Sequence, residues 1–198
     1  MYLCQYHKME KESEFAVAFL VIVLCSLSAY FISDFAGNTQ LRILSGKECL
    51  GAYKILFQVN KVTSLFVPIV ICAFISTTTH ILLSDFFEEK IKFAHIFSIV
   101  GIAMIPILLD NYFFWINLIS YAANSSIRTI NDFMNIRYYG NLTITNFETI
   151  NTICWILVYM IIITRLYALK IKFYKAAVAT ILPTLVLIIT YYSITFLI

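Results

Sequence analysis

Residues 15–33 read FAVAFLVIVLCSLSAYFIS, a run of nineteen residues without a charged side chain. A helix needs roughly 20 apolar residues to cross a hydrocarbon core about 30 Å thick. Irregular backbone cannot face lipid there, because its N–H and C=O groups would lack hydrogen-bond partners. The run therefore predicts a membrane-spanning helix.

The composition extends this prediction to the whole chain. Of its 198 residues, 61% are hydrophobic and 13% are charged, whereas soluble domains have roughly 45–50% apolar and about 25% charged residues. The 5 glycines are too few for the regular turns of a membrane β-barrel. We therefore expect an all-α, polytopic transmembrane helical bundle that forms a single membrane domain over residues 1–198.

Apolar segments of suitable length predict about five spans, at residues 15–33, 62–83, 93–109, 152–168 and 176–198. Residues 111–124, NYFFWINLISYAAN, are apolar and aromatic but contain three asparagines. We expect them to continue the third span as an interfacial extension, because aromatic rings are enriched at the membrane surface. Their insertion as a sixth span is the alternative.

Residues 41–61 show a helical pattern of their own. Lys47, Lys54 and Lys61 recur every seven residues, with Gln58 on the same side. This periodicity predicts an amphipathic helix at the interface that leads into the second span. The four residues are a candidate face for lipid or for a protein partner.

Positive charge near the spans predicts the orientation. The loops SDFFEEKIK and RLYALKIKFYK are short and basic, which favours placing them and the N-terminus in the cytoplasm.

Motifs for catalysis or for a cofactor are not found. The chain has no GxSxG, HExxH or phosphate-binding GKS/T sequence, and its 5 cysteines lack a metal-binding spacing. We therefore expect no enzyme activity, cofactor or metal. The net charge of +3 comes without a dense basic run, so no nucleic acid is expected as a partner.

Polar residues within or beside the spans are the remaining candidates for function. In IVGIAMIPILLD, residues 99–110, we interpret Asp110 first as the point where a helix kinked at Pro106 leaves the lipid. Asp110, Asn111 and the carbonyls freed by Pro106 would instead share a pocket if residues 111–124 folded back. His80 and His95 lie near one membrane surface, as structural histidines or as groups that handle protons or ions.

The order of these features resembles the Yip1 family of small five-span membrane proteins. The segment Gly101-Ile102-Ala103-Met104-Ile105-Pro106 is similar to a motif of that family's third span, and Lys175-Ala176 is similar to the start of its fifth. Eukaryotic relatives dock GTPases through a long cytosolic N-terminal region. Because residues 1–14 alone precede the first span, the resemblance favours a Yip1-like protein of a bacterial cytoplasmic membrane over one of a eukaryotic endomembrane.

The expected function is that of a non-enzymatic accessory or scaffold subunit in membrane transport or trafficking. Its partners would be the lipid bilayer and another membrane protein or a second copy of itself. The alternative is a permease, such as the transmembrane subunit of an ABC exporter, for which residues 111–124 would have to supply a sixth span.

Overall fold

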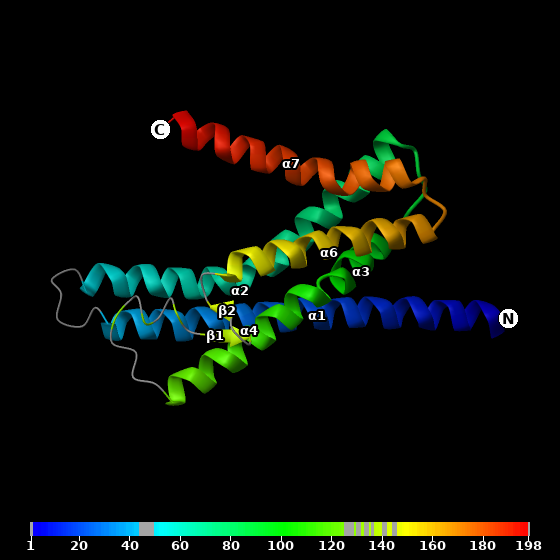
Figure 1. Ribbon diagram of the computed structural model, residues 1–198. Coiled ribbons are helices and arrows are strands. Elements are labelled where there is room, and N and C mark those ends of the chain that lie inside the picture. Colours follow the sequence, from blue (N-terminus) through cyan, green and yellow to red (C-terminus); the bar gives the residue numbers. More distant parts are fainter. Residues whose placement is uncertain are drawn as a thin grey trace. The chain divides into compact units, whose positions relative to one another are not determined.

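The computed structural model describes residues 2–43, 50–124, 129, 132, 135, 137–139, 142–143 and 146–197. Nearly all of this is helix, which confirms the all-α prediction (Figure 1). The helices are α1 (Tyr2–Ile43), α2 (Leu50–Ile81), the π-helical turn η1 (Leu82–Phe86), α3 (Phe93–Ala103), α4 (Ile105–Asn124), α6 (Phe147–Ala168) and α7 (Phe173–Leu197). Two short antiparallel strands, β1 (Arg137–Tyr139) and β2 (Leu142–Thr143), pair Arg137 with Thr143.

Four stretches in the described part of the chain are long and apolar enough to cross a membrane. They are Ser13–Arg42, Gly51–Phe86, Phe93–Ile116 and Thr149–Ala168. A shorter apolar helix covers Phe173–Ile189, so a fifth span at residues 176–198 stays a prediction.

The first two helices are longer than the apolar segments that predict them. The helix predicted at residues 41–61 is divided between two helices: α1 ends at Ile43, and α2 begins at Leu50 and continues unbroken into the second span, as its predicted lead into that span requires. No glycine or proline interrupts residues 52–67, so the helix has no local reason to end at Lys61. Lys47 lies outside the described residues.

The third predicted span continues past residue 109. The helix breaks at Met104, whose N–H donates to the Gly101 carbonyl at 3.2 Å, and α4 then continues to Asn124, as expected for residues 111–124. Pro106 lies in the first turn of α4, where its missing N–H breaks no helix hydrogen bond. By length and composition the candidate span reaches Ile116, beyond the end predicted at residue 109.

The chain forms two compact units. The first comprises Met1–Ile22, Val70–Ile105 and Ile156–Ile198, and the second comprises Val23–Ile69 and Pro106–Trp155.

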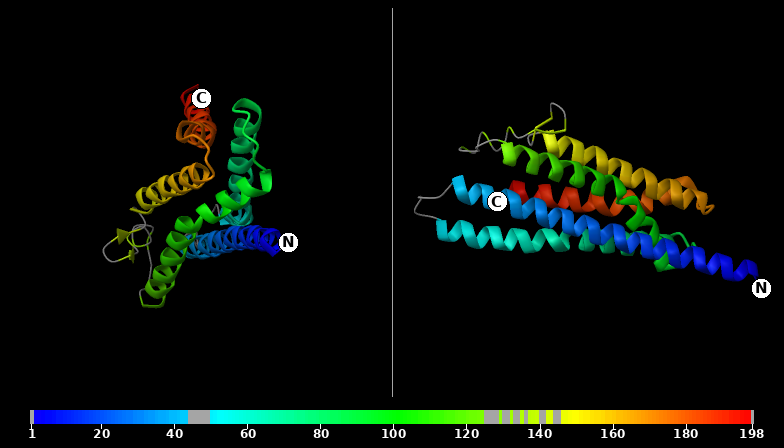
Figure 2. Two further views of the ribbon diagram at one scale, coloured as in Figure 1. Left: turned by 90° about the vertical axis from the view of Figure 1, so that its right-hand side faces the viewer. Right: turned by 90° about the horizontal axis from the view of Figure 1, so that it is seen from below.

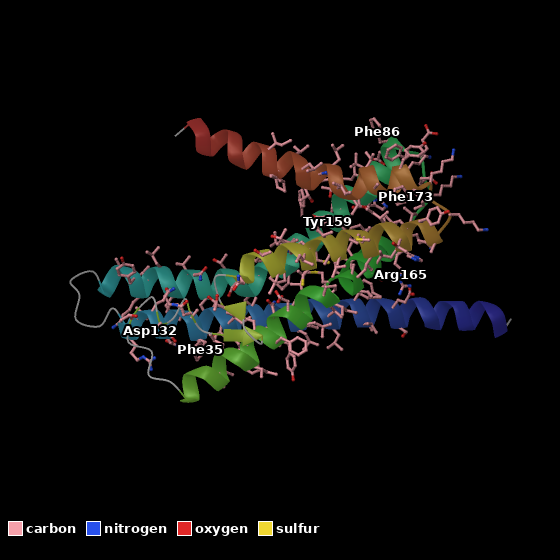
Figure 3. The ribbon with its side chains drawn as sticks, in the orientation of Figure 1. Phe35, Phe86, Asp132, Tyr159, Arg165 and Phe173 are labelled. Carbon is pink, nitrogen blue, oxygen red and sulfur yellow. The ribbon has the colours of Figure 1, made fainter. Side chains whose placement is uncertain are left out.

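In the first unit, small residues and hydroxyl groups join the helices. Gly101 of α3 lies against Ala18 of α1, so closely that a Cβ added at Gly101 would be 2.7 Å from the Ala18 Cβ. Thr79 of α2 donates to the Ala179 carbonyl of α7 at 3.4 Å. The Tyr159 hydroxyl of α6, labelled in Figure 3, is 2.6 Å from Thr184 Oγ1 of α7. Small residues and interhelical hydroxyl bonds are typical of helix packing in membranes.

Two turns at one end of the first unit use left-handed residues other than glycine. Lys170 has φ 67°, and its N–H donates to the Tyr167 carbonyl while that of Ile171 donates to Leu166. This is the Schellman arrangement, in which glycine is usual at the left-handed position. Glu88 has φ 55° in the turn after η1.

Lys175 fastens the turn that contains Glu88. Its ammonium donates to Glu89 Oε1 at 2.6 Å and to the Phe87 carbonyl at 3.2 Å. The hydrogen bond to Glu89 raises the pKa of Lys175, so this ammonium stays charged at physiological pH.

In the second unit, α1 and α2 run antiparallel and side by side (Figures 1 and 2). Asn60 Nδ2 donates to Ser33 Oγ at 3.2 Å, and Gly37 lies against the ring of Phe57. Lys61 forms an ion pair with Asp34 at 2.6 Å and lies over the ring of Tyr30. Phe57 and Lys61 both face α1, because residues four apart share one side of a helix.

The close contact at Gly101 is testable with a matched control at Gly51, where an added Cβ would meet nothing within 4 Å. Alanine in place of glycine favours a helix interior by about 1 kcal/mol, and by less at Gly51, the second residue of α2. Overpacking against Ala18 should cost Gly101→Ala about 1–3 kcal/mol relative to Gly51→Ala. The measurement is reversible unfolding of the two purified variants in mixed micelles; equal stabilities would contradict the contact.

Candidate functional site

Asp110 lies in a span and is buried. It belongs to α4, with apolar residues 105–109 before it and aromatic residues 112–115 after Asn111. Its exposed fraction is 7%, and that of Asn111 is 8%. Ionisable residues inside membrane spans are rare and usually functional, because a charge at the helix centre costs roughly 2.5–3.5 kcal/mol on insertion scales.

Asn111 connects α4 to α1. Its Nδ2 donates to Ser28 Oγ at 3.2 Å, and Ser28 Oγ in turn donates to the Cys25 carbonyl at 2.8 Å. The Ser28 hydroxyl thus donates a hydrogen bond within α1 and accepts one from α4. Such interhelical bonds in membranes contribute about 0.6 kcal/mol on average.

Asp110 is connected to α6. The side chain of Asn151 lies near enough to its carboxyl to act on it as a hydrogen-bonding group, and Cys154, three residues further along α6, lies within electrostatic range of Asp110. We call the side chains of Ser28, Asp110, Asn111, Asn151 and Cys154 the Asp110 cluster. They come from three helices, α1, α4 and α6, and all belong to the second unit.

One oxygen of the Asp110 carboxyl is left over. Oδ2 is buried and has no hydrogen-bond partner among the described residues. A buried acceptor without a partner costs about 1–3 kcal/mol, and more when it is charged. The cluster therefore contains an acceptor for one additional proton or ligand.

The interpretation of Asp110 as the point where the helix leaves the lipid stays a prediction, and the contacts of the cluster place it relative to α1. Asp34 and Lys61 form the charged pair where α1 and α2 lie together in the second unit. Ser28 is six residues before Asp34 on α1, which is about 9 Å along a helix. Ser28, which accepts the bond from Asn111, is thus about 9 Å along α1 from that pair, and the candidate span that contains Asp110 continues to Ile116.

The other predicted polar residues lie elsewhere. Pro106 is half-buried one turn before Asp110 on α4. His80 is half-buried with its ring edge-on to Phe93, 5.8 Å between centroids, and His95 lines a cavity. Both histidines belong to the first unit, so they are not members of the Asp110 cluster.

The predicted lipid or partner face is divided. Lys54 and Gln58 are exposed, whereas Lys61 is paired with Asp34 of α1. Lys47 cannot be assigned, because it lies outside the described residues.

Sequence reasoning missed three members of the cluster: Ser28, Asn151 and Cys154. Ser28 has no distinguishing pattern within its apolar run, and small hydroxyl residues are common in spans. Asn151, placed directly before the fourth predicted span, was the one available signal. In the described part of the chain, no group of three or more His, Cys, Asp or Glu side chains is placed to hold a metal ion.

Comparisons of the chain with family models, with curated proteins and with solved structures gave no match. The resemblance to the Yip1 family therefore stays a prediction.

The bond between α1 and α4 is testable by a double-mutant cycle of Ser28→Ala and Asn111→Ala. Unfolding free energies measured in mixed micelles should give a coupling of about 0.6 kcal/mol and at most about 1.7 kcal/mol. The matched control is Ser64→Ala with Asn111→Ala, because Ser64 Oγ donates to the Lys61 carbonyl. Additive effects in the Ser28 cycle would contradict the contact.

Proposed function

We propose that the protein is a non-enzymatic, multi-span membrane protein that works in membrane transport, with Asp110 as its proton-binding residue. The observation that carries the proposal is the buried Oδ2 of Asp110, which lacks a partner among the described residues. Chains of Asp, Glu or His inside spans are the usual proton relays of pumps and transporters. This favours a transport subunit over a purely structural role.

A proton fits the cluster better than a metal ion. Hard divalent cations take about six oxygen ligands or more. The described cluster offers one carboxyl group together with neutral amide, hydroxyl and thiol side chains from Asn111, Asn151, Ser28 and Cys154. A proton needs a single lone pair, and binding it removes the charge that is costly in lipid.

A cavity in the second unit supports access of water from one side. It has a volume of about 420 Å³ and lies between α1 and α4, where Phe31 stacks on Trp115 at 5.7 Å between centroids. Phe35, labelled in Figure 3, also lines it. Trp115 is five residues after Asp110, about 7.5 Å along the helix. The cavity lining does not include Asp110, so in this proposal a proton entering there crosses the remaining distance to the carboxyl through the packed helices.

The test is proton flux into liposomes that contain the purified protein, driven by a potassium diffusion potential and followed with an internal pH-sensitive dye. Wild-type protein should acidify the interior, and Asp110→Asn should reduce the flux to that of protein-free liposomes. Asp85→Asn, which changes an exposed aspartate, is the matched control and should keep the flux. Flux unchanged in Asp110→Asn, or absent from wild type, would contradict the proposal.

The second candidate function is the accessory or scaffold role that the Yip1-like resemblance implies. It is favoured by Lys54 and Gln58, two exposed polar residues within the candidate span Gly51–Phe86. Polar side chains on a span commonly pair with another helix. In this role, the partner is another membrane protein that supplies groups for Lys54 and Gln58.

Co-purification from native membranes tests this second role. Lys54→Leu with Gln58→Leu should remove a partner that wild type retains. Val59→Leu, at an exposed apolar position of the same helix, is the control and should retain it. Equal recovery of the partner with both variants would contradict the role of these residues.

A further inference from the structure

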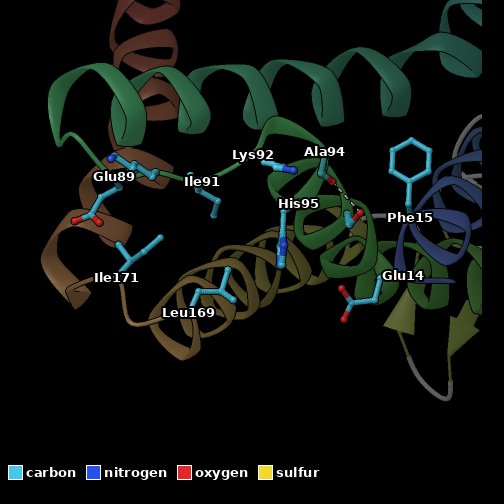
Figure 4. Close-up of a pocket in the computed structure, with 11 residues that line it drawn as sticks. Glu14, Phe15, Glu89, Ile91, Lys92, Ala94, His95, Leu169 and Ile171 are labelled. Atoms are coloured by element: carbon cyan, nitrogen blue, oxygen red, sulfur yellow. Dashed lines mark hydrogen bonds between the residues drawn. The ribbon is translucent and has the colours of Figure 1, made fainter. Parts of the chain in front are cut away.

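A cavity of about 890 Å³ lies in the first unit, apart from the residues of the Asp110 cluster (Figure 4). The chain from Glu89 to Lys92 and the first turns of α3 form much of its wall. Glu14 and Phe15 of α1, and Leu169 and Ile171 of the turn before α7, complete it. The left-handed residues Glu88 and Lys170 form the turns that bring residues 89–92 and residues 169–171 to the cavity wall.

The ends of the candidate spans put the cavity at the level expected for the membrane–water boundary. Two candidate spans begin beside it, at Ser13 and Phe93, and two end beside it, at Phe86 and Ala168. Glu14 is one residue inside its span, and Leu169 is one residue beyond its own. Phospholipid headgroups occupy this level of a bilayer, between the hydrocarbon core and water.

The cavity wall combines apolar surface with charges of both signs. Phe15, Ile91, Leu169 and Ile171 give the apolar surface, and Lys90, Lys92 and His95 give the basic groups. The acidic groups are Glu14 and Glu89. The Glu89 carboxylate forms an ion pair with the ammonium of Lys175 at 2.6 Å. Figure 4 shows Glu14 on the wall opposite Lys92, with His95 between them.

We propose that this cavity binds a phospholipid with a zwitterionic, primary-amine headgroup, such as phosphatidylethanolamine. Lys92 and His95 contact the phosphate, assisted by the start of α3, where Lys92 makes no side-chain cap and backbone N–H groups favour an anion. The Glu14 carboxylate accepts hydrogen bonds from the headgroup ammonium. The acyl chains leave along Phe15 and Ile91.

The charges argue for this headgroup over an anionic one. A headgroup with phosphate alone would satisfy the lysines but leave the Glu14 carboxylate facing a like charge, and like charges in contact are a common source of selectivity. A primary amine donates hydrogen bonds to a carboxylate, and these charge-assisted bonds are the stronger kind.

The test uses the full-length protein in detergent and measures lipid binding by native mass spectrometry. The probes are phosphatidylethanolamine and phosphatidylglycerol with identical acyl chains. Wild type should bind phosphatidylethanolamine about tenfold more tightly, which corresponds to about 1.4 kcal/mol. Glu14→Gln should abolish this preference without weakening phosphatidylglycerol binding, and Lys92→Gln should weaken both lipids.

Lys172→Gln is the matched control, because Lys172 is exposed in the same turn region but does not line the cavity. It should bind both lipids as wild type does. Equal or tighter binding of phosphatidylglycerol by wild type would overturn the proposal whether or not the variants fold. An unchanged lipid preference in a folded Glu14→Gln variant would also overturn it.

Discussion

In a hydrocarbon core, a polar group can find its partner only within the protein, and this constraint organises the structure. It requires the backbone to be helical over each span. It also explains the side-chain pairs Asn60 with Ser33, Lys61 with Asp34 and Asn111 with Ser28. Three buried side-chain oxygens of the described residues depart from this pattern: Ser26 Oγ, Ser76 Oγ and Asp110 Oδ2, of which the carboxyl oxygen is the most costly because it can carry charge. A departure of this kind is the usual mark of function inside a membrane.

The two units place their polar groups differently. The second unit holds them among apolar helices, where a neutral network surrounds one carboxyl. The first unit has hydroxyl groups between its helices and charged groups at helix ends, where Lys175 fastens the loop after η1 to the start of α7. Glu88 and Lys170 have left-handed backbone conformations, which are unfavourable for residues with a Cβ. Such strained positions concentrate at functional sites, and here both lie in the loops that enclose the cavity.

The sequence predicted the helical class and the approximate position of each apolar segment, because hydrophobic length is a local property. It did not predict where helices end, since α1 and α2 continue beyond their apolar parts. Asp110 was singled out, but its burial depends on neighbours that are distant in the sequence, Asn151 and, through Asn111, Ser28. The cavity was not predicted for the same reason: Glu14, Lys92 and Leu169 come from three separate segments. Left-handed turns without glycine leave no local signal.

The central claim is that the Asp110 carboxyl takes up a proton inside the membrane. Infrared difference spectroscopy of the reconstituted protein between alkaline and acidic pH tests this directly. A protonated-carboxyl band should appear on acidification in wild type and in Asp85→Asn, and its component from an apolar environment should be missing from Asp110→Asn. An identical difference spectrum for Asp110→Asn and wild type would contradict the claim.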